Sequence, residues 1–192
     1  MSKIEIFGFA PSTYVQTVRL LCRELDLDYT LLPLEFRQES HRVLHPFLKM
    51  PALRHGDITL FETLAIAMYL CGQVTEPQLV PAKLLNRCDM FAWISVGMDY
   101  YYAHLVGPSM GDQSQPVELE HWLCPLQRKL SATPYVAGPE ISVADLVLLP
   151  MLLFVGNSLG ESAFQPFPAV ASWLQALQNR QGYAEVLQHD AQ

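Results

Sequence analysis

Apolar positions in the first 35 residues follow two different spacings. Short continuous apolar runs occupy Lys3–Phe7 and Asp28–Leu34, and each run is short enough for a buried strand. Between them, apolar residues recur at helical spacing on one face, at Val15, Val18, Cys22 and Leu25. A strand, a helix and a second strand within so few residues predict a βαβ unit.

The next segment changes from irregular to strongly patterned. Phe36–Leu48 is polar and shows no clear period, so no regular element is predicted there. Ala52–His55 and Ile58–Phe61 flank Gly56-Asp57, which predicts a tight β-hairpin. A helix is predicted from Glu62 to Cys71, with Gly72 placed to end it.

The remaining chain is helical in pattern. Val74–Ala82 contains Pro77 and Pro81 and little periodicity, which indicates a linker. Further helices are predicted from an apolar stripe at Met90, Ile94, Met98, Tyr101 and Leu105, and over Val117–Leu130, the apolar run after Ser142, and Val170–Leu177. Ser142-Val143-Ala144-Asp145 has the form of a capping box. We therefore predict an α/β domain over 1–75, a linker over 76–82 and an all-α bundle over 83–192.

Composition and charge exclude several classes of function. The chain has 192 residues and a formal net charge of −7, and its 12 Lys and Arg are scattered, unlike the basic stripe of a nucleic-acid binder. Its most apolar run, Leu146–Val155, is shorter than the ~20 residues that span a bilayer. The four cysteines form no C-x-x-C pair, and no histidine stands at zinc-ligand spacing. We expect a cytoplasmic protein with reduced thiols, no metal, and neither a membrane nor a nucleic acid as partner.

Ser12 is the first residue with candidate chemistry. It follows a predicted strand and stands at the start of a predicted helix, where free N–H groups and positive potential favour an anion. Its hydroxyl can cap the helix or donate a hydrogen bond to a bound anion such as a thiolate. Thr13 and Tyr14 offer competing hydroxyls, and the local pattern does not choose among the three.

Two further segments could hold a peptide-like ligand. Pro51 opens a predicted strand, and a cis bond before it would turn the Met50 backbone outward to pair with an extended peptide. Glu62 and Thr63 stand at the start of the next helix. Free N–H groups and the Thr63 hydroxyl suit a carboxylate, and Glu62 suits an ammonium group. An α-amino-acid end matches both requirements, although both residues are also ordinary at a helix start.

These segments together resemble the glutathione transferase family, in particular its serine-dependent, phi-like and bacterial branch. The matching stretches are Gly8–Thr13, His45–Leu53, Leu60–Leu70 and the capping box at Ser142–Asp145. The resemblance covers nearly the whole chain. It implies a thioredoxin-like domain followed by a helical domain, assembled as a homodimer, with glutathione as cosubstrate and a role in detoxification. The chain departs from the family pattern at Thr17, His45 and Thr63.

The resemblance also implies roles for individual residues. Ser12 matches the hydroxyl that stabilises the glutathione thiolate, and Met50 beside a cis Pro51 matches the backbone that pairs with the cysteinyl part. Glu62 and Thr63 match the pair that holds the γ-glutamyl end. Lys49 and His41 lie where the glycine carboxylate is usually bound.

A small apolar electrophile would need an apolar wall beside the thiolate. Phe9 and Pro11 are candidates from the first domain, and Tyr101 and His104 are candidates from the long helix, where core packing is the alternative.

Two other functions remain open. One is a glutathione-dependent isomerase or peroxidase that uses the same site, and the other is a non-catalytic regulatory protein on the same fold.

Overall fold

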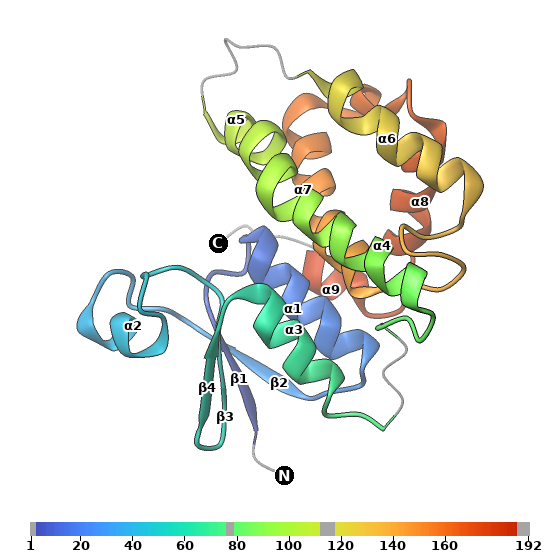
Figure 1. The fold of residues 1–192 in the computed structure, drawn as a ribbon. Coiled ribbons are helices and arrows are strands. Elements are labelled where there is room, and N and C mark those ends of the chain that lie inside the picture. The colour runs from blue at the N-terminus through green and yellow to red at the C-terminus, as the bar shows by residue number, and fades with distance from the viewer. Residues whose placement is uncertain (1–2, 76–78, 112–117, 188–192) are drawn as a thin grey trace. The chain divides into compact units, whose positions relative to one another are not determined.

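The computed structural model describes residues 3–75, 79–111 and 118–187. They form two compact units, and Figure 1 shows the elements of each. The first unit contains the described residues up to position 75 together with 181–187, and the second contains 79–180. The predicted linker at 76–82 lies partly outside the described residues.

The first unit is built on a mixed four-stranded sheet. Its strands are β1 (Ile4–Phe7), β2 (Tyr29–Leu32), β3 (Ala52–His55) and β4 (Ile58–Phe61), in the order β2-β1-β3-β4. β1 is parallel to β2 and antiparallel to β3, and β3 and β4 form the hairpin. The helices are α1 (Thr13–Glu24), α2 (Glu39–Leu44) and α3 (Thr63–Cys71), and α1 and α3 contact each other and the sheet (Figure 1). This arrangement confirms the predicted thioredoxin-like domain.

Close packing of α1 on the sheet depends on Gly8, the residue after β1. A β-carbon at Gly8 would lie 2.5 Å from Val15 Cγ2, closer than van der Waals contact permits. Val15, Val18, Cys22 and Leu25 are buried, as the apolar spacing predicts. The absence of a side chain at Gly8 therefore sets how near the start of α1 approaches the strands.

The described residues 181–187 belong to the same compact unit as the sheet. α9 (Tyr183–Leu187) packs on α1. The Tyr183 hydroxyl donates a hydrogen bond to Glu24 Oε1 at 2.7 Å, and Arg23 forms an ion pair with Glu185. Arg19 Nη1 donates to the Val186 carbonyl at 3.3 Å. Periodicity identifies an amphipathic helix, but it does not identify the surface against which that helix packs.

The second unit is helical. Its elements are α4 (Leu84–Ser95), the π-helix η1 (Val96–Val106), α5 (Gly107–Met110), α6 (Leu119–Ala132), α7 (Val143–Leu159), the 3₁₀-helix η2 (Glu161–Phe164) and α8 (Pro168–Gln178). α7 is buried along most of its length and contacts α4, η1, α5, α8 and η2. None of the described helices is long and apolar enough to cross a membrane.

The predicted capping box at the start of α7 is present and extends beyond the helix. Asp145 is fully buried, and its two carboxylate oxygens accept four hydrogen bonds. The donors are the Ser142 N–H and hydroxyl, at 2.9 and 2.8 Å, and the Val136 N–H and Trp173 Nε1, both at 3.0 Å. Burial raises the pKa of Asp145, while these hydrogen bonds oppose the rise. One carboxylate thus joins the start of α7 to two neighbouring segments.

Two elements differ from the predicted pattern. α2 forms within Phe36–Leu48, where no regular element is predicted. Only six residues are helical and only His41 among them is buried, so no apolar period marks this helix in the sequence. The long apolar stripe continues from α4 into the π-helix η1, in which hydrogen bonds skip one additional residue. Gly97 at this transition permits close packing, since a β-carbon there would lie 2.9 Å from Leu148 Cδ2.

Candidate functional site

Strand register brings three of the predicted segments to one end of the sheet. Ala52 pairs with Phe7 on one side and with Phe61 on the other. The residues that follow β1, precede β3 and follow β4 are therefore neighbours, because adjacent strands lie about 4.8 Å apart. These neighbours are Gly8–Ser12, Met50-Pro51 and Glu62-Thr63. The helices α1 and α3 both begin at this end, so two sets of free N–H groups meet there.

Ser12 is the N-cap residue of α1, and its hydroxyl does not cap the helix. The backbone is extended (φ −64°, ψ 125°), and the side chain makes no hydrogen bond to the first-turn N–H groups. The turn is held by the backbone, because the Ser12 N–H donates to the Phe9 carbonyl and the Ser12 carbonyl accepts from the Gln16 N–H. The half-buried Ser12 side chain is thus available for another partner. Thr13, in contrast, is only 4% exposed.

The Met50–Pro51 peptide bond is cis. Pro51 is buried, and β3 begins one residue later at Ala52. Among the described residues, the Met50 N–H and carbonyl make no hydrogen bond, although both lie beside the strands. An extended ligand segment could pair with this backbone in the manner of an additional strand.

Glu62 has a backbone conformation that is uncommon for a residue with a side chain. Its φ is +70° and its ψ is 124°, and such conformations cost about 1–3 kcal/mol and cluster at ligand sites. The Glu62 side chain is 63% exposed. Thr63 is the first residue of α3 and is 5% exposed. An acidic group and a helix N-terminus are therefore presented side by side.

His41 does not have a free nitrogen for a ligand carboxylate. It is 1% exposed, and its Nδ1 accepts a hydrogen bond from the Arg37 N–H at 3.1 Å. Its Nε2 consequently carries the proton and donates to the Lys49 carbonyl at 2.8 Å. The structure thus gives His41 a supporting role, in which it fixes the loop before Met50. The Lys49 side chain is exposed and stays a predicted carboxylate ligand.

An aromatic surface lies on the first unit next to the start of α1. Phe9 is 42% exposed and Phe36 is 40% exposed, and their ring centroids are 5.8 Å apart. Pro11 is also exposed. Phe36 was not among the residues selected from the sequence. A phenylalanine within a polar segment could have indicated an apolar binding surface there. His45, buried against Glu62, is a second residue that sequence reasoning did not place in the site.

The two candidates from the long helix have different surroundings within the second unit. Tyr101 is 1% exposed, and its hydroxyl donates to the Trp122 carbonyl at 2.9 Å. Burial raises its pKa, as expected for a core phenol. Tyr101 is thus a core residue, and its assignment to an electrophile pocket is not retained. His104 is exposed, with its ring stacked on Trp122 at 4.5 Å, and it stays a candidate.

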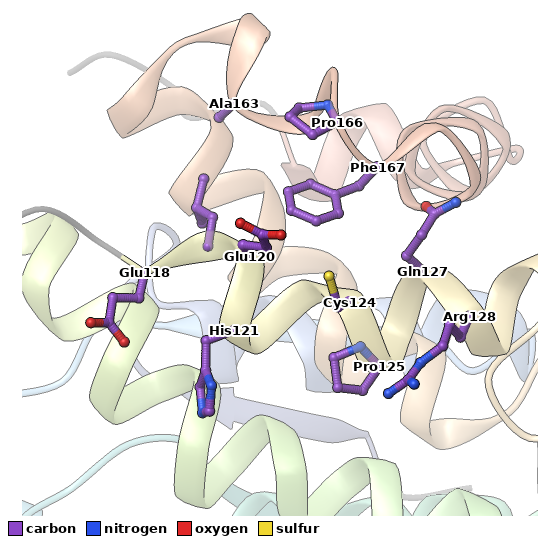
Figure 2. Close-up of a pocket in the computed structure, with 11 residues that line it drawn as sticks. Glu118, Glu120, His121, Cys124, Pro125, Gln127, Arg128, Ala163, Pro166 and Phe167 are labelled. Atoms are coloured by element: carbon purple, nitrogen blue, oxygen red, sulfur yellow. The ribbon is translucent and has the colours of Figure 1, made fainter.

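A groove of about 920 Å³ lies in the second unit. Figure 2 shows it between α6 and the segment around η2 that leads into α8, with Cys124, Gln127, Arg128, Ala163 and Phe167 among its lining residues. The Cys124 sulfur and the His121 ring extend from opposite sides of α6 in this view, so His121 is not placed to activate the thiol. Gln127 Oε1 already accepts from the Ala169 N–H at 2.9 Å. None of the residues predicted to bind glutathione lines this groove.

Both halves of the chain match one family by sequence. Residues 6–78 match "Glutathione S-transferase, N-terminal domain", and residues 112–190 match "Glutathione S-transferase, C-terminal domain". Glutathione S-transferase 1 from Triticum aestivum is 26% identical over 98% of this chain and 95% of that protein. The relatives include plant phi-class enzymes, as the phi-like resemblance predicts.

Solved structures agree with the sequence match. Poplar glutathione transferase F1 is 26% identical and superposes with a TM-score of 0.83, covering 97% of both chains. Glutathione S-transferase-I bound with lactoylglutathione is 25% identical, with a TM-score of 0.81, and covers 97% of this chain and 99% of that one. Sequence, fold and the grouping of the predicted segments at one end of the sheet lead to the same conclusion, which is that this chain belongs to the glutathione S-transferase family.

Proposed function

We propose that this protein is a glutathione transferase that binds glutathione at the end of the sheet where β1, β3 and β4 meet. The observation that carries the proposal is the strand register, which makes the segments at Ser12, Met50 and Glu62-Thr63 neighbours. The γ-glutamyl end would lie on Glu62 and the start of α3, and the cysteinyl backbone would pair with Met50. The thiol would then lie near Ser12 at the start of α1, and Lys49 would meet the glycine carboxylate.

The chemistry follows from the surroundings proposed for the sulfur. A free thiol has a pKa near 8.5, so little of it is ionised at neutral pH. The start of α1 and the Ser12 hydroxyl favour the thiolate, and lowering its pKa by about 2 units requires about 2.7 kcal/mol. The thiol proton passes to solvent, and the thiolate forms a carbon–sulfur bond to an electrophile resting on Phe9, Pro11 and Phe36. With 1-chloro-2,4-dinitrobenzene, chloride leaves with the electrons of the carbon–chlorine bond.

Replacing Ser12 by alanine tests this assignment. We expect kcat/KM for conjugation of 1-chloro-2,4-dinitrobenzene to fall about ten- to hundredfold, since a hydrogen bond to an anion contributes about 1.5–3 kcal/mol. The melting temperature should change little, because the hydroxyl makes no capping bond whose loss would cost about 1 kcal/mol.

Matched variants decide among the three neighbouring hydroxyls. Tyr14→Phe and Thr13→Val, which each remove one hydroxyl, are compared with Ser12→Ala in the same conjugation assay and the same thermal melts. Unchanged conjugation in Ser12→Ala with a large loss in Tyr14→Phe would transfer the thiolate contact to Tyr14. Glutathione binding without turnover in the wild type would favour the regulatory protein, and turnover only with a peroxide or an isomerisable substrate would favour the other alternative.

We also propose that the protein is a cytoplasmic homodimer, and an exposed apolar patch on the first unit supports the assembly. Phe47 is 70% exposed, Val43 75% and Phe61 37%, and the Phe47 and Phe61 rings are 6.3 Å apart. A patch of this kind on an isolated chain marks an interaction surface. We expect light scattering to give twice the 21.7 kDa chain mass for the wild type and mostly the single mass for Phe47→Ser.

Leu84→Ser provides the control for this prediction. Leu84 is 64% exposed and lies in the second unit, so the change removes a comparable exposed apolar side chain elsewhere. If Phe47→Ser is still a dimer, or if the wild type is a monomer, this patch is not a dimer interface.

A further inference from the structure

His45 is a buried histidine in contact with the proposed glutathione site. Its side chain is 2% exposed. The ring lies 5.1 Å from the Phe61 ring on β4, 6.4 Å from the Phe47 ring and 6.5 Å from the His41 ring on α2. These rings shield the imidazole from water on several sides, so its charge depends on the few polar groups that reach it.

The two nitrogens of His45 have different surroundings. Nε2 lies 3.7 Å from Glu62 Oε1, and Nδ1 is buried without a hydrogen-bond partner among the described residues. With a proton on Nε2 facing the carboxylate, Nδ1 keeps an unused lone pair that can take up a second proton. His41 differs, because both of its nitrogens are engaged by backbone groups. His45 is thus the histidine of this region that can change its charge without breaking a hydrogen bond.

Three charged or titratable groups act on His45. Burial lowers its pKa from the ordinary value of 6.5, and His41 and Lys49 lower it further, while Glu62 opposes the change. The imidazole is therefore neutral at pH 7, and the Glu62 carboxylate is left for a ligand. Below the lowered pKa, an imidazolium forms next to that carboxylate and competes with any other cation placed there.

We propose that His45 makes glutathione binding pH-dependent by competing, when protonated, with the ligand ammonium group for the Glu62 carboxylate. This inference rests on the proposed function, which places the γ-glutamyl ammonium at Glu62. The linkage has a definite sign. A bound ammonium offsets the negative charge that favours the imidazolium, so binding lowers the pKa of His45 further and releases its proton. Affinity is therefore full above pH 6.5 and declines as the pH falls through the pKa of His45 in the free protein.

Calorimetric titration with S-methylglutathione at pH 7.0 and 5.5 tests this inference. The methyl group removes the thiol titration, and both carboxylates stay ionised and the amino group largely protonated at these pH values. We expect the wild-type dissociation constant to be about fivefold higher at pH 5.5. The effect is moderate because the Glu62 side chain is 63% exposed and water screens part of the interaction. In His45→Asn, the two dissociation constants should agree within about twofold.

A second ligand distinguishes the protonation of His45 from other effects of low pH on binding, and this comparison needs no variant. S-Methyldeaminoglutathione lacks the amino group but keeps both carboxylates and the methylated sulfur, so its affinity for the wild type should not fall between pH 7.0 and 5.5. An equal fall for both ligands, or no fall for S-methylglutathione, would overturn the role of His45 and leave glutathione binding intact. No binding of S-methylglutathione at pH 7.0 would instead refute the proposed function and this inference together. If His45→Asn does not fold, the comparison of the two ligands still decides.

Discussion

Replacing Thr63 by alanine should weaken glutathione binding about ten- to hundredfold, as measured by calorimetric titration at pH 7.0. Thr63 is the first residue of α3, and we propose that its hydroxyl and the free N–H groups of the first turn bind the γ-glutamyl carboxylate. A hydrogen bond to a charged group contributes about 1.5–3 kcal/mol, and each 1.4 kcal/mol corresponds to a tenfold change in affinity.

Two further variants make this prediction specific. Thr63→Ser keeps the hydroxyl and should retain affinity within a few fold of the wild type, which separates the hydrogen bond from the packing of a side chain that is 5% exposed. Thr59→Ala is the matched control, because Thr59 is exposed on β4 and lies away from the start of α3. Equal affinities for Thr63→Ala and Thr59→Ala would show that the hydroxyl does not bind the ligand.

Replacing Asp145 by asparagine should destabilise the protein by about 2–4 kcal/mol. The amide oxygen can still accept from Val136 and Trp173, but the amide NH₂ would face the two Ser142 donors. The buried Ser142 N–H would then lack a partner, which costs about 1–3 kcal/mol, and two hydrogen bonds to a carboxylate are lost. Differential scanning calorimetry should show a melting temperature lower by roughly 5–15 °C.

Asp99→Asn provides the comparison for Asp145→Asn. Asp99 is exposed in the first turn of η1, so the same chemical change there should shift the melting temperature by only about 1–2 °C. If both variants melt alike, the four hydrogen bonds of Asp145 do not contribute net stability. Glutathione binding by Asp145→Asn at low temperature should persist, because Asp145 lies in the second unit and the proposed glutathione residues lie in the first.

Sequence patterns correctly predicted those elements whose structure depends on interactions between residues close together in the chain. The hairpin strands Ala52–His55 and Ile58–Phe61 have the predicted bounds, since the Gly56-Asp57 turn between them defines where each strand ends. The capping box at Ser142–Asp145 is likewise contained in four consecutive residues. The short helix α2 was missed, because only one of its six residues is buried and no apolar period arises.

The candidate site likewise contains residues that the sequence selected correctly and residues whose surroundings it did not predict. Ser12, Met50-Pro51 and Glu62-Thr63 were selected from turn and helix-start signals, and the structure makes their segments neighbours through the pairing of Ala52 with Phe7 and Phe61. His41 was assigned to binding from the family resemblance, and Tyr101 from its place on the predicted long helix. Their burial and their hydrogen bonds to the Lys49 and Trp122 carbonyls depend on residues 8 and 21 positions away, which no local window contains.

The sequence by itself determined the βαβ unit, the hairpin, the capping box and the residue types suited to a γ-glutamyl peptide. Those features depend on spacing and on the preferences of helix starts and turns, which act over a few residues. Only the tertiary structure decided that the Ser12 hydroxyl leaves α1 uncapped, that α9 packs on α1, and that His45 is buried 3.7 Å from Glu62. Burial and contacts between distant residues arise when the whole chain packs, and they set which polar groups remain available to a ligand.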